Sequence, residues 1–196
     1  MSKIDEKTRA ARRAQILAAA ATRFARTGYH ATTMADVATE AGVSKGTPYL
    51  YFPGKETLYV RLYEEWDRGL AKRIEITTSA MRADARTSPR QVLRAVVTAI
   101  GAHVAEHSDI SRVLTESRAL AAYQPIIAAA ARGTDAVARQ IEDLIKEGVA
   151  AGEWPGETDH TLRARIITAA VHGLMAQWHL APGSFSWAEA ADALAS

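Results

Sequence analysis

The chain of 196 residues contains no cysteine, so it can form neither disulfide bonds nor thiolate metal sites. It has only 6 prolines and 12 glycines, and β-branched residues do not alternate with polar ones in strand-like runs. No apolar run approaches the roughly 20 residues that span a membrane, and the charged N-terminus is unlike a signal peptide. We therefore expect an all-α protein of one or two domains, located in the cytoplasm and without a membrane partner.

The positive charge of the chain is concentrated near its N-terminus. The net charge is only +2, but residues 1–60 contain nine Lys or Arg against five Asp or Glu, a net charge of +4. Residues 61–196 carry a net charge of −2. Because basic segments attract phosphate groups whatever the base sequence, this distribution favours a nucleic-acid contact in the first 60 residues.

A stretch in that basic part, 33–55, predicts two short helices joined by a tight turn. Apolar residues spaced three and four apart indicate a first helix at 34–41. Thr33 and Asp36 fit a capping box at its start, and Gly42 fits the left-handed residue at its end. Ser44 is a natural N-cap for a second helix. This is the layout of a helix-turn-helix, whose second helix enters the major groove of DNA.

Several apolar side chains of this stretch are expected to form its core. They are Met34, Val37, Val43, Leu50 and Phe52. The supporting helix is expected at 5–27, with Gly28 after its last turn.

The rest of the chain predicts helices throughout, about nine in all. Apolar periodicity, together with Ser88–Pro89–Gln91 as a cap, indicates helices at 55–81, 88–107, 109–120, 125–152, 159–180 and from Ser186 to about 194. No flexible linker separates the two halves. We therefore place a helix-turn-helix domain at 1–54 and a larger domain at 55–196, with the boundary inside or beside the helix after Lys55.

One short motif offers a competing interpretation. His103, Glu106 and His107 match H-x-x-E-H, which on a helix brings two imidazoles to one face, as in a zinc hydrolase. A hydrolase would need a third ligand and a substrate-enclosing body, so we expect no enzyme, no metal and no cofactor. A contact from His103 or His107 to a metal or a ligand inside a regulator remains the alternative to an ordinary helix end, where His107 lies near the C-terminal dipole.

The run TTMADVATEAGVSKGTPYLYFPGKETLY resembles the N-terminal signature of the TetR family of bacterial transcriptional regulators, over about residues 12–60. The resemblance implies a three-helix DNA-binding head and a larger helical body that binds a small molecule and dimerises. Pro48 stands where many members have leucine, and we expect it to make an apolar contact, such as one with a thymine methyl group. The resemblance implies DNA contacts from Thr33, Ser44, Lys45, Gly46, Thr47, Pro48, Tyr49, Tyr51 and Lys55.

For the body, the same resemblance implies an effector pocket and a dimer surface on the last two helices. Residues combining apolar surface with polar groups suggest an apolar or amphipathic effector, held by Trp66, His103, Arg118, Tyr123 and Met175. The dimer contacts are expected from Val171, Leu174, Trp178, Trp187 and Leu194. The chain is then expected to be a homodimeric repressor, released from a palindromic operator by its ligand; an activator or a ligand-independent regulator is the alternative.

Overall fold

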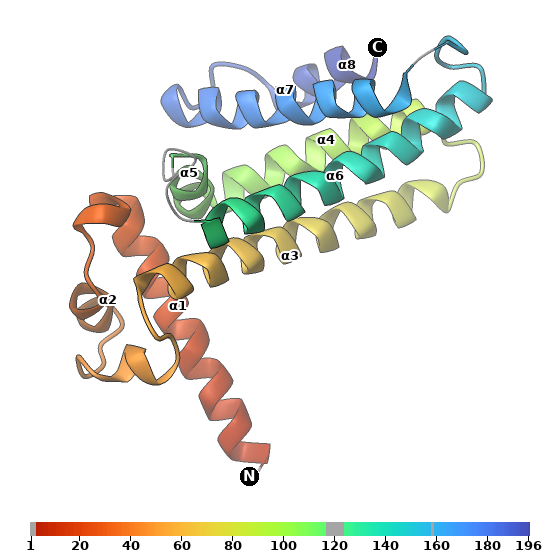
Figure 1. The fold of residues 1–196 in the computed structure, drawn as a ribbon. Helices are drawn as coiled ribbons and strands as arrows, with labels where there is room; N and C mark the ends of the chain where they lie inside the picture. The colour runs from red at the N-terminus through yellow and green to blue at the C-terminus, as the bar shows by residue number, and fades with distance from the viewer. Residues whose placement is uncertain (1–2, 117–123, 158) are drawn as a thin grey trace. The chain divides into compact units, whose positions relative to one another are not determined.

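The computed structural model describes residues 3–116, 124–157 and 159–196, and these residues form helices and no strand. Eight α-helices and one short 3₁₀ helix, η1, follow one another along the chain (Figure 1). The all-α prediction is therefore confirmed. The elements are α1 (Lys3–Ala31), α2 (Met34–Glu40), η1 (Thr47–Leu50), α3 (Lys55–Arg82), α4 (Pro89–Glu106), α5 (Ser108–Glu116), α6 (Gln124–Ala150), α7 (His160–Leu180) and α8 (Trp187–Ala195).

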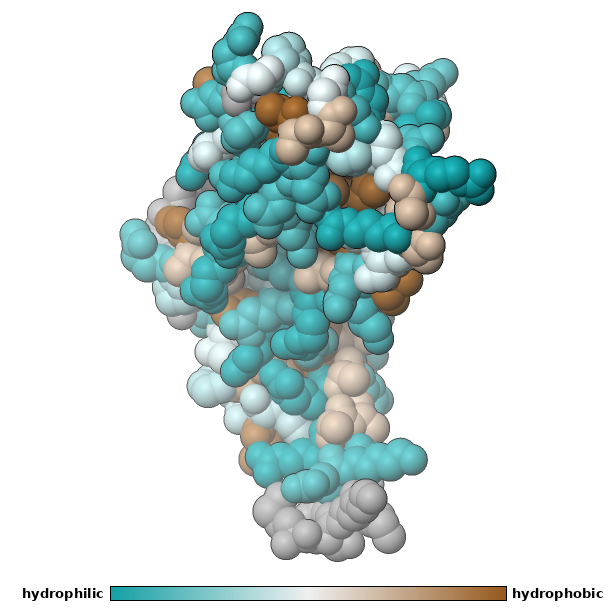
Figure 2. Space-filling model, turned by 90° about the vertical axis from the view of Figure 1, so that its right-hand side faces the viewer, coloured by the Kyte–Doolittle hydropathy of each residue, from teal (hydrophilic) through white to brown (hydrophobic). Residues whose placement is uncertain are grey.

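The described helices can be compared with the length and hydropathy that a membrane-spanning helix needs. None of them is both long and apolar enough to cross a bilayer. The face shown in Figure 2 is largely hydrophilic, and its hydrophobic residues lie in small, separate patches.

Side chains cap the starts of α4 and α7, and the cap of α4 is the one that the sequence predicts. At α4 the Oγ of Ser88 accepts a hydrogen bond from the backbone N of Gln91 at 3.3 Å. The Oε1 of Gln91 in turn accepts a hydrogen bond from the Ser88 backbone N at 2.9 Å. At α7, Asp159 Oδ1 accepts from the backbone N of Leu162 at 2.9 Å. These side chains satisfy amide groups that the first turn of a helix leaves without partners.

Contacts between residues group the chain into two compact units. The first unit comprises Met1–Trp66 with Asp109–Ala129, and the second comprises Asp67–Ser108 with Ala130–Ser196. Helix α5 joins the first unit because Arg112 donates to the carbonyl oxygen of Ala25 at 2.8 Å, and the Tyr59 hydroxyl donates to that of Val113 at 3.1 Å. The predicted division into domains after residue 54 stays a prediction.

The core of the first unit joins α1, α2 and the start of α3. Its aromatic centre is Phe24, whose ring centroid lies 5.5 Å from that of Tyr29 and 5.7 Å from that of Tyr59. Phe52 is buried beside the helix-turn-helix, as the sequence predicts, and so are Met34 and Val37. The basic helix α1 thus serves as the packing support for the two elements after it.

In the second unit, α4 is the central helix, and α8 packs closely against it. The buried side chains of α4 include Val92, Val96 and Ile100. A Cβ atom at Gly101 would lie 2.2 Å from Cγ and Cδ2 of Trp187. Only glycine therefore permits the indole of Trp187 to lie directly on the backbone of α4.

We expect the substitution Gly101→Ala to destabilise the protein by up to about 2 kcal/mol. The methyl group must displace Trp187, an overpacking cost of about 1–3 kcal/mol that exceeds the roughly 1 kcal/mol gained from alanine's helix propensity. The urea midpoint of unfolding is the measurement. An unchanged or raised midpoint would contradict the close contact between α4 and α8.

Candidate nucleic-acid interface

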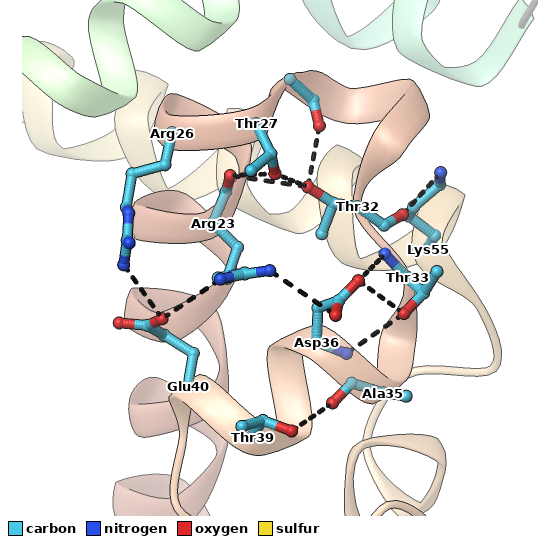
Figure 3. A network of polar contacts seen from close by, with 11 residues as sticks. Arg23, Arg26, Thr27, Thr32, Thr33, Ala35, Asp36, Thr39, Glu40 and Lys55 are labelled. Carbon is cyan, nitrogen blue, oxygen red and sulfur yellow. Dashed lines mark hydrogen bonds and ion pairs between the residues drawn. The ribbon is translucent and has the colours of Figure 1, made fainter.

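Helix α2 is fixed at its start by a capping box. The Oγ1 of Thr33 accepts a hydrogen bond from the Asp36 backbone N at 3.1 Å. The Oδ2 of Asp36 accepts bonds from the backbone N of Thr33 at 2.9 Å and from its hydroxyl at 2.7 Å. Figure 3 shows that Arg23 of α1 reaches both Asp36 and Glu40, at 3.5 and 3.9 Å. Helix α2 is thus held against α1 near both of its ends.

The charge of Asp36 in this capping box is expected to make the stability of the fold depend on pH. Hydrogen bonds from the Thr33 side chain and backbone, with the nearby charge of Arg23, lower the pKa of Asp36 below its usual value of 3.8. A lowered folded-state pKa stabilises the fold above pH 3.8, and this stabilisation is lost as the pH falls through the lowered value. We expect Asp36→Asn to unfold at lower urea concentration than the wild type at pH 7. The difference should shrink below about pH 4, and a difference that is independent of pH would contradict the role of the charge.

The turn after α2 has the geometry that the sequence predicts. Gly42 has φ 63°, which its missing Cβ allows without strain. The backbone N of Gly42 donates to the Thr39 carbonyl at 3.1 Å, and that of Val43 donates to the Ala38 carbonyl at 3.0 Å. This pair of bonds is a Schellman motif, and it ends α2 sharply before the recognition segment, which we define as residues 44–52.

The recognition segment is not the α-helix opening at Ser44 that the sequence predicts. It contains the 3₁₀ helix η1, Thr47–Leu50. Pro48 has no N–H with which to bond the Ser44 carbonyl four residues back, so the Thr47 backbone N takes that carbonyl at 2.9 Å. Ser44 was expected to cap this helix by accepting a backbone N–H. Its hydroxyl instead shares a hydrogen bond with the Thr47 hydroxyl at 2.7 Å.

Two side chains of the recognition segment differ from expectation. Pro48 is buried, so its predicted contact with a base edge is wrong. Leu50 was expected in the core and is 75% exposed, while Val43 is only half-buried. Pro48 and Phe52 lie four residues apart and both face inward, which turns Tyr49 and Leu50 outward. That spacing of two apolar residues is the signal that sequence reasoning missed.

Most of the other residues that are predicted to contact DNA lie on the surface of the first unit. Tyr49 is 55% exposed, and Thr33, Ser44, Lys45 and Gly46 are also exposed. Thr47, Tyr51 and Lys55 are half-buried. The contacts themselves stay predictions. The surface of the recognition segment combines hydroxyls, a lysine ammonium and an apolar patch, the groups that phosphates and base edges engage.

The predicted effector residues are divided between the two units, and their contact with an effector stays a prediction. Trp66 is buried in the first unit, whereas His103 and Met175 are buried in the second. Arg118 and Tyr123 lie outside the described residues. The second unit has a groove of about 470 Å³ between α3, α4 and α6, and no predicted effector residue lines it.

The H-x-x-E-H motif lies at the end of α4. The rings of His103 and His107 meet edge to face with centroids 4.6 Å apart. Glu106 instead accepts two hydrogen bonds from Arg73 of α3, at 3.1 and 2.5 Å, which lower its pKa. Among the described residues, no three His, Asp or Glu side chains gather as a set of metal ligands.

The last two helices contain apolar surface, but not at every predicted residue. Val171 is buried inside the protomer, so it is not available for a dimer contact. Trp187 is half-buried against Gly101, and Leu174, Trp178 and Leu194 are also half-buried. Helix α7 instead exposes Leu162, Ile166 and Leu180, by 55%, 58% and 86%. Sequence reasoning missed these three because α7 is apolar on both faces, which conceals the inward face.

Comparison with known proteins identifies the family. Residues 16–62 match the family model for bacterial regulatory proteins of the tetR family, and residues 86–196 match the tetracyclin repressor-like C-terminal domain. The chain belongs to the TetR family. This TetR-family chain is 44% identical over 71 residues to YfiR of Bacillus subtilis, an uncharacterized HTH-type transcriptional regulator, covering 36% of this chain and 35% of that protein.

Two further comparisons extend over the body of this TetR-family protein. It is 34% identical over 137 residues to the transcriptional activator FasR of Mycolicibacterium smegmatis, covering 68% of this chain and 58% of FasR. The chain therefore spans between about a third and three fifths of these curated relatives. The crystal structure of FadR from Bacillus subtilis in complex with stearoyl-CoA matches with a TM-score of 0.76 at 20% identity, covering 92% of this chain and 94% of that one. At this identity the match shows a shared fold.

Proposed function

We propose that this chain is a DNA-binding transcriptional regulator that responds to a small molecule. The observation that carries the proposal is the surface of the recognition segment. Helix α2 is capped and ion-paired to α1, and the segment after it exposes Lys45, Tyr49 and Leu50. A rigid support that presents a cation, a phenol and an apolar side chain suits both phosphate contacts and base reading.

The proposed regulator acts as a homodimer through α7 and α8. The exposed side chains of Leu162 and Ile166 lie one helical turn apart, and Leu180 continues the same helix. A row of exposed apolar residues on one helix is unusual for a monomer, and a second copy would cover it. A two-fold dimer presents two recognition segments, so its operator is palindromic, with half-sites about one helical turn or a multiple apart.

The proposed effector is an apolar or amphipathic molecule that releases the dimer from DNA. FadR, which shares the fold, was crystallised with stearoyl-CoA, so long-chain acyl-CoA is the first class to test. Release requires that the effector bind the DNA-free conformation more tightly than the DNA-bound one. We favour a repressor; the relative FasR is named an activator, which keeps activation as the alternative.

The test is binding of the purified protein to DNA that contains its own promoter region. A footprint with two-fold symmetry, at a salt concentration where random DNA is not bound, is the expected result. Stearoyl-CoA should then remove the footprint, and a transcription assay with and without it distinguishes repression from activation. Equal affinity for promoter and random DNA would contradict the proposed function.

A further inference from the structure

Lys55, the first residue of α3, is predicted to contact DNA, but its ammonium group forms three hydrogen bonds within the protein. Its Nζ donates to the carbonyl oxygens of Tyr29 at 2.8 Å, His30 at 3.2 Å and Thr32 at 2.9 Å. The same nitrogen lies 4.5 Å from the centroid of the Tyr29 ring. A lysine ammonium has three hydrogens, so the three carbonyls occupy every donor that it has.

These carbonyls belong to the corner that joins α1 to α2. The regular helix of α1 breaks at Gly28, whose φ and ψ are 78° and 162°. Carbonyl groups at a helix end lack intrahelical partners and carry partial negative charge, which a cation stabilises. Thr32 at this corner is 1% exposed, and its hydroxyl donates to the Gly28 carbonyl at 2.8 Å. The ammonium of Lys55 is therefore part of a partly buried hydrogen-bond network.

The contacts of Lys55 also join the two ends of the helix-turn-helix. Thr32 directly precedes Thr33, the N-cap of α2, and Lys55 follows the recognition segment in the chain. Figure 3 shows Lys55 beside Thr32 and the Thr33–Asp36 cap. Closing the segment between residues 32 and 55 in this way reduces the conformations open to the recognition segment before it meets DNA.

We propose that Lys55 is a positioning residue for DNA recognition, and that its ammonium remains on the three carbonyls instead of binding a phosphate. This inference rests on the proposed DNA-binding function. A phosphate could capture the ammonium only by taking its donors from the carbonyls of Tyr29, His30 and Thr32, and those hydrogen bonds would be lost.

The substitution Lys55→Met tests the proposal because it keeps the length of the side chain and removes the charge. We expect the melting temperature of the DNA-free protein to fall by about 5 °C. Well below that temperature, operator affinity should fall roughly tenfold through the cost of ordering the recognition segment. The dependence of log affinity on log salt concentration should keep its slope, and binding to random DNA should not change.

Lys45→Met is the matched control, since Lys45 lies exposed on the recognition segment. It should leave the melting temperature unchanged and lower the salt slope by about one, the signature of a lost phosphate contact. A salt slope lowered by about one in Lys55→Met would overturn the proposal, whatever happens to the melting temperature. Unchanged operator affinity in a stable Lys55→Met protein would overturn it as well.

A measurement on the wild-type protein covers the case in which Lys55→Met does not fold. In the DNA-free protein, an amine-acetylating reagent should modify Lys55 several-fold more slowly than Lys45, and in urea the two rates should converge. Equal rates in the folded protein would overturn the proposal. Because this measurement and the melting temperature need no DNA, their failure is distinct from a failure of the proposed function.

Discussion

The substitution Ile166→Asp is expected to convert the protein into a folded monomer. Ile166 is 58% exposed on α7, so the protomer alone tolerates a carboxylate there. In a two-fold dimer the substitution occurs twice at one interface, where each unpaired charge would lose its hydration. We expect the dimer dissociation constant to rise at least about 100-fold, measured by light scattering on a sizing column over a range of concentrations.

Ile76→Asp provides a closely matched control for this experiment. Ile76 is 59% exposed, but it lies on α3 instead of α7. The Ile76 variant should remain a dimer and bind the operator normally. The Ile166 variant should lose operator affinity along with the dimer, because two linked recognition segments bind far more tightly than one. A dimeric Ile166→Asp protein would place the interface elsewhere on the chain.

How much the sequence predicted depended on whether a feature is local. The capping boxes at Thr33 and Ser88 were predicted correctly, because four consecutive residues contain both partners of each hydrogen bond. The left-handed turn at Gly42 followed from one residue type. Phe52 was predicted in the core as an aromatic residue, and it is buried. Each of these features depends on a few neighbours in the chain.

The errors arose where a second element decides the outcome. The inward face of α7 cannot be told from its outer face by periodicity, so Val171 was assigned to the wrong side. The bonds of Lys55 join it to carbonyls 23 to 26 residues earlier, which no local pattern encodes. At Pro48 an apolar contact with DNA was predicted, but η1 buries the ring and turns Leu50 outward.

Leu50→Glu is expected to abolish operator binding while leaving the protein folded. Leu50 is 75% exposed, so the substitution loses little buried surface. The free energy of unfolding, measured with urea, should stay within about 0.5 kcal/mol of the wild-type value. At a DNA surface the same carboxylate would meet the phosphates and replace an apolar contact with base edges or sugars. We expect an affinity loss of more than about 100-fold at physiological salt, measured by fluorescence anisotropy with labelled operator.

Leu50→Ala separates the apolar contact from the effect of charge. If Leu50 touches a thymine methyl group, shortening it should weaken operator binding by roughly ten- to a hundredfold. Binding to random DNA, which depends on phosphate contacts, should not change. Tyr49→Phe should do the reverse and weaken both complexes alike, because a phenol hydroxyl bonds phosphate whatever the sequence. Equal losses on operator and random DNA for Leu50→Ala would show that this side chain supports binding without reading bases.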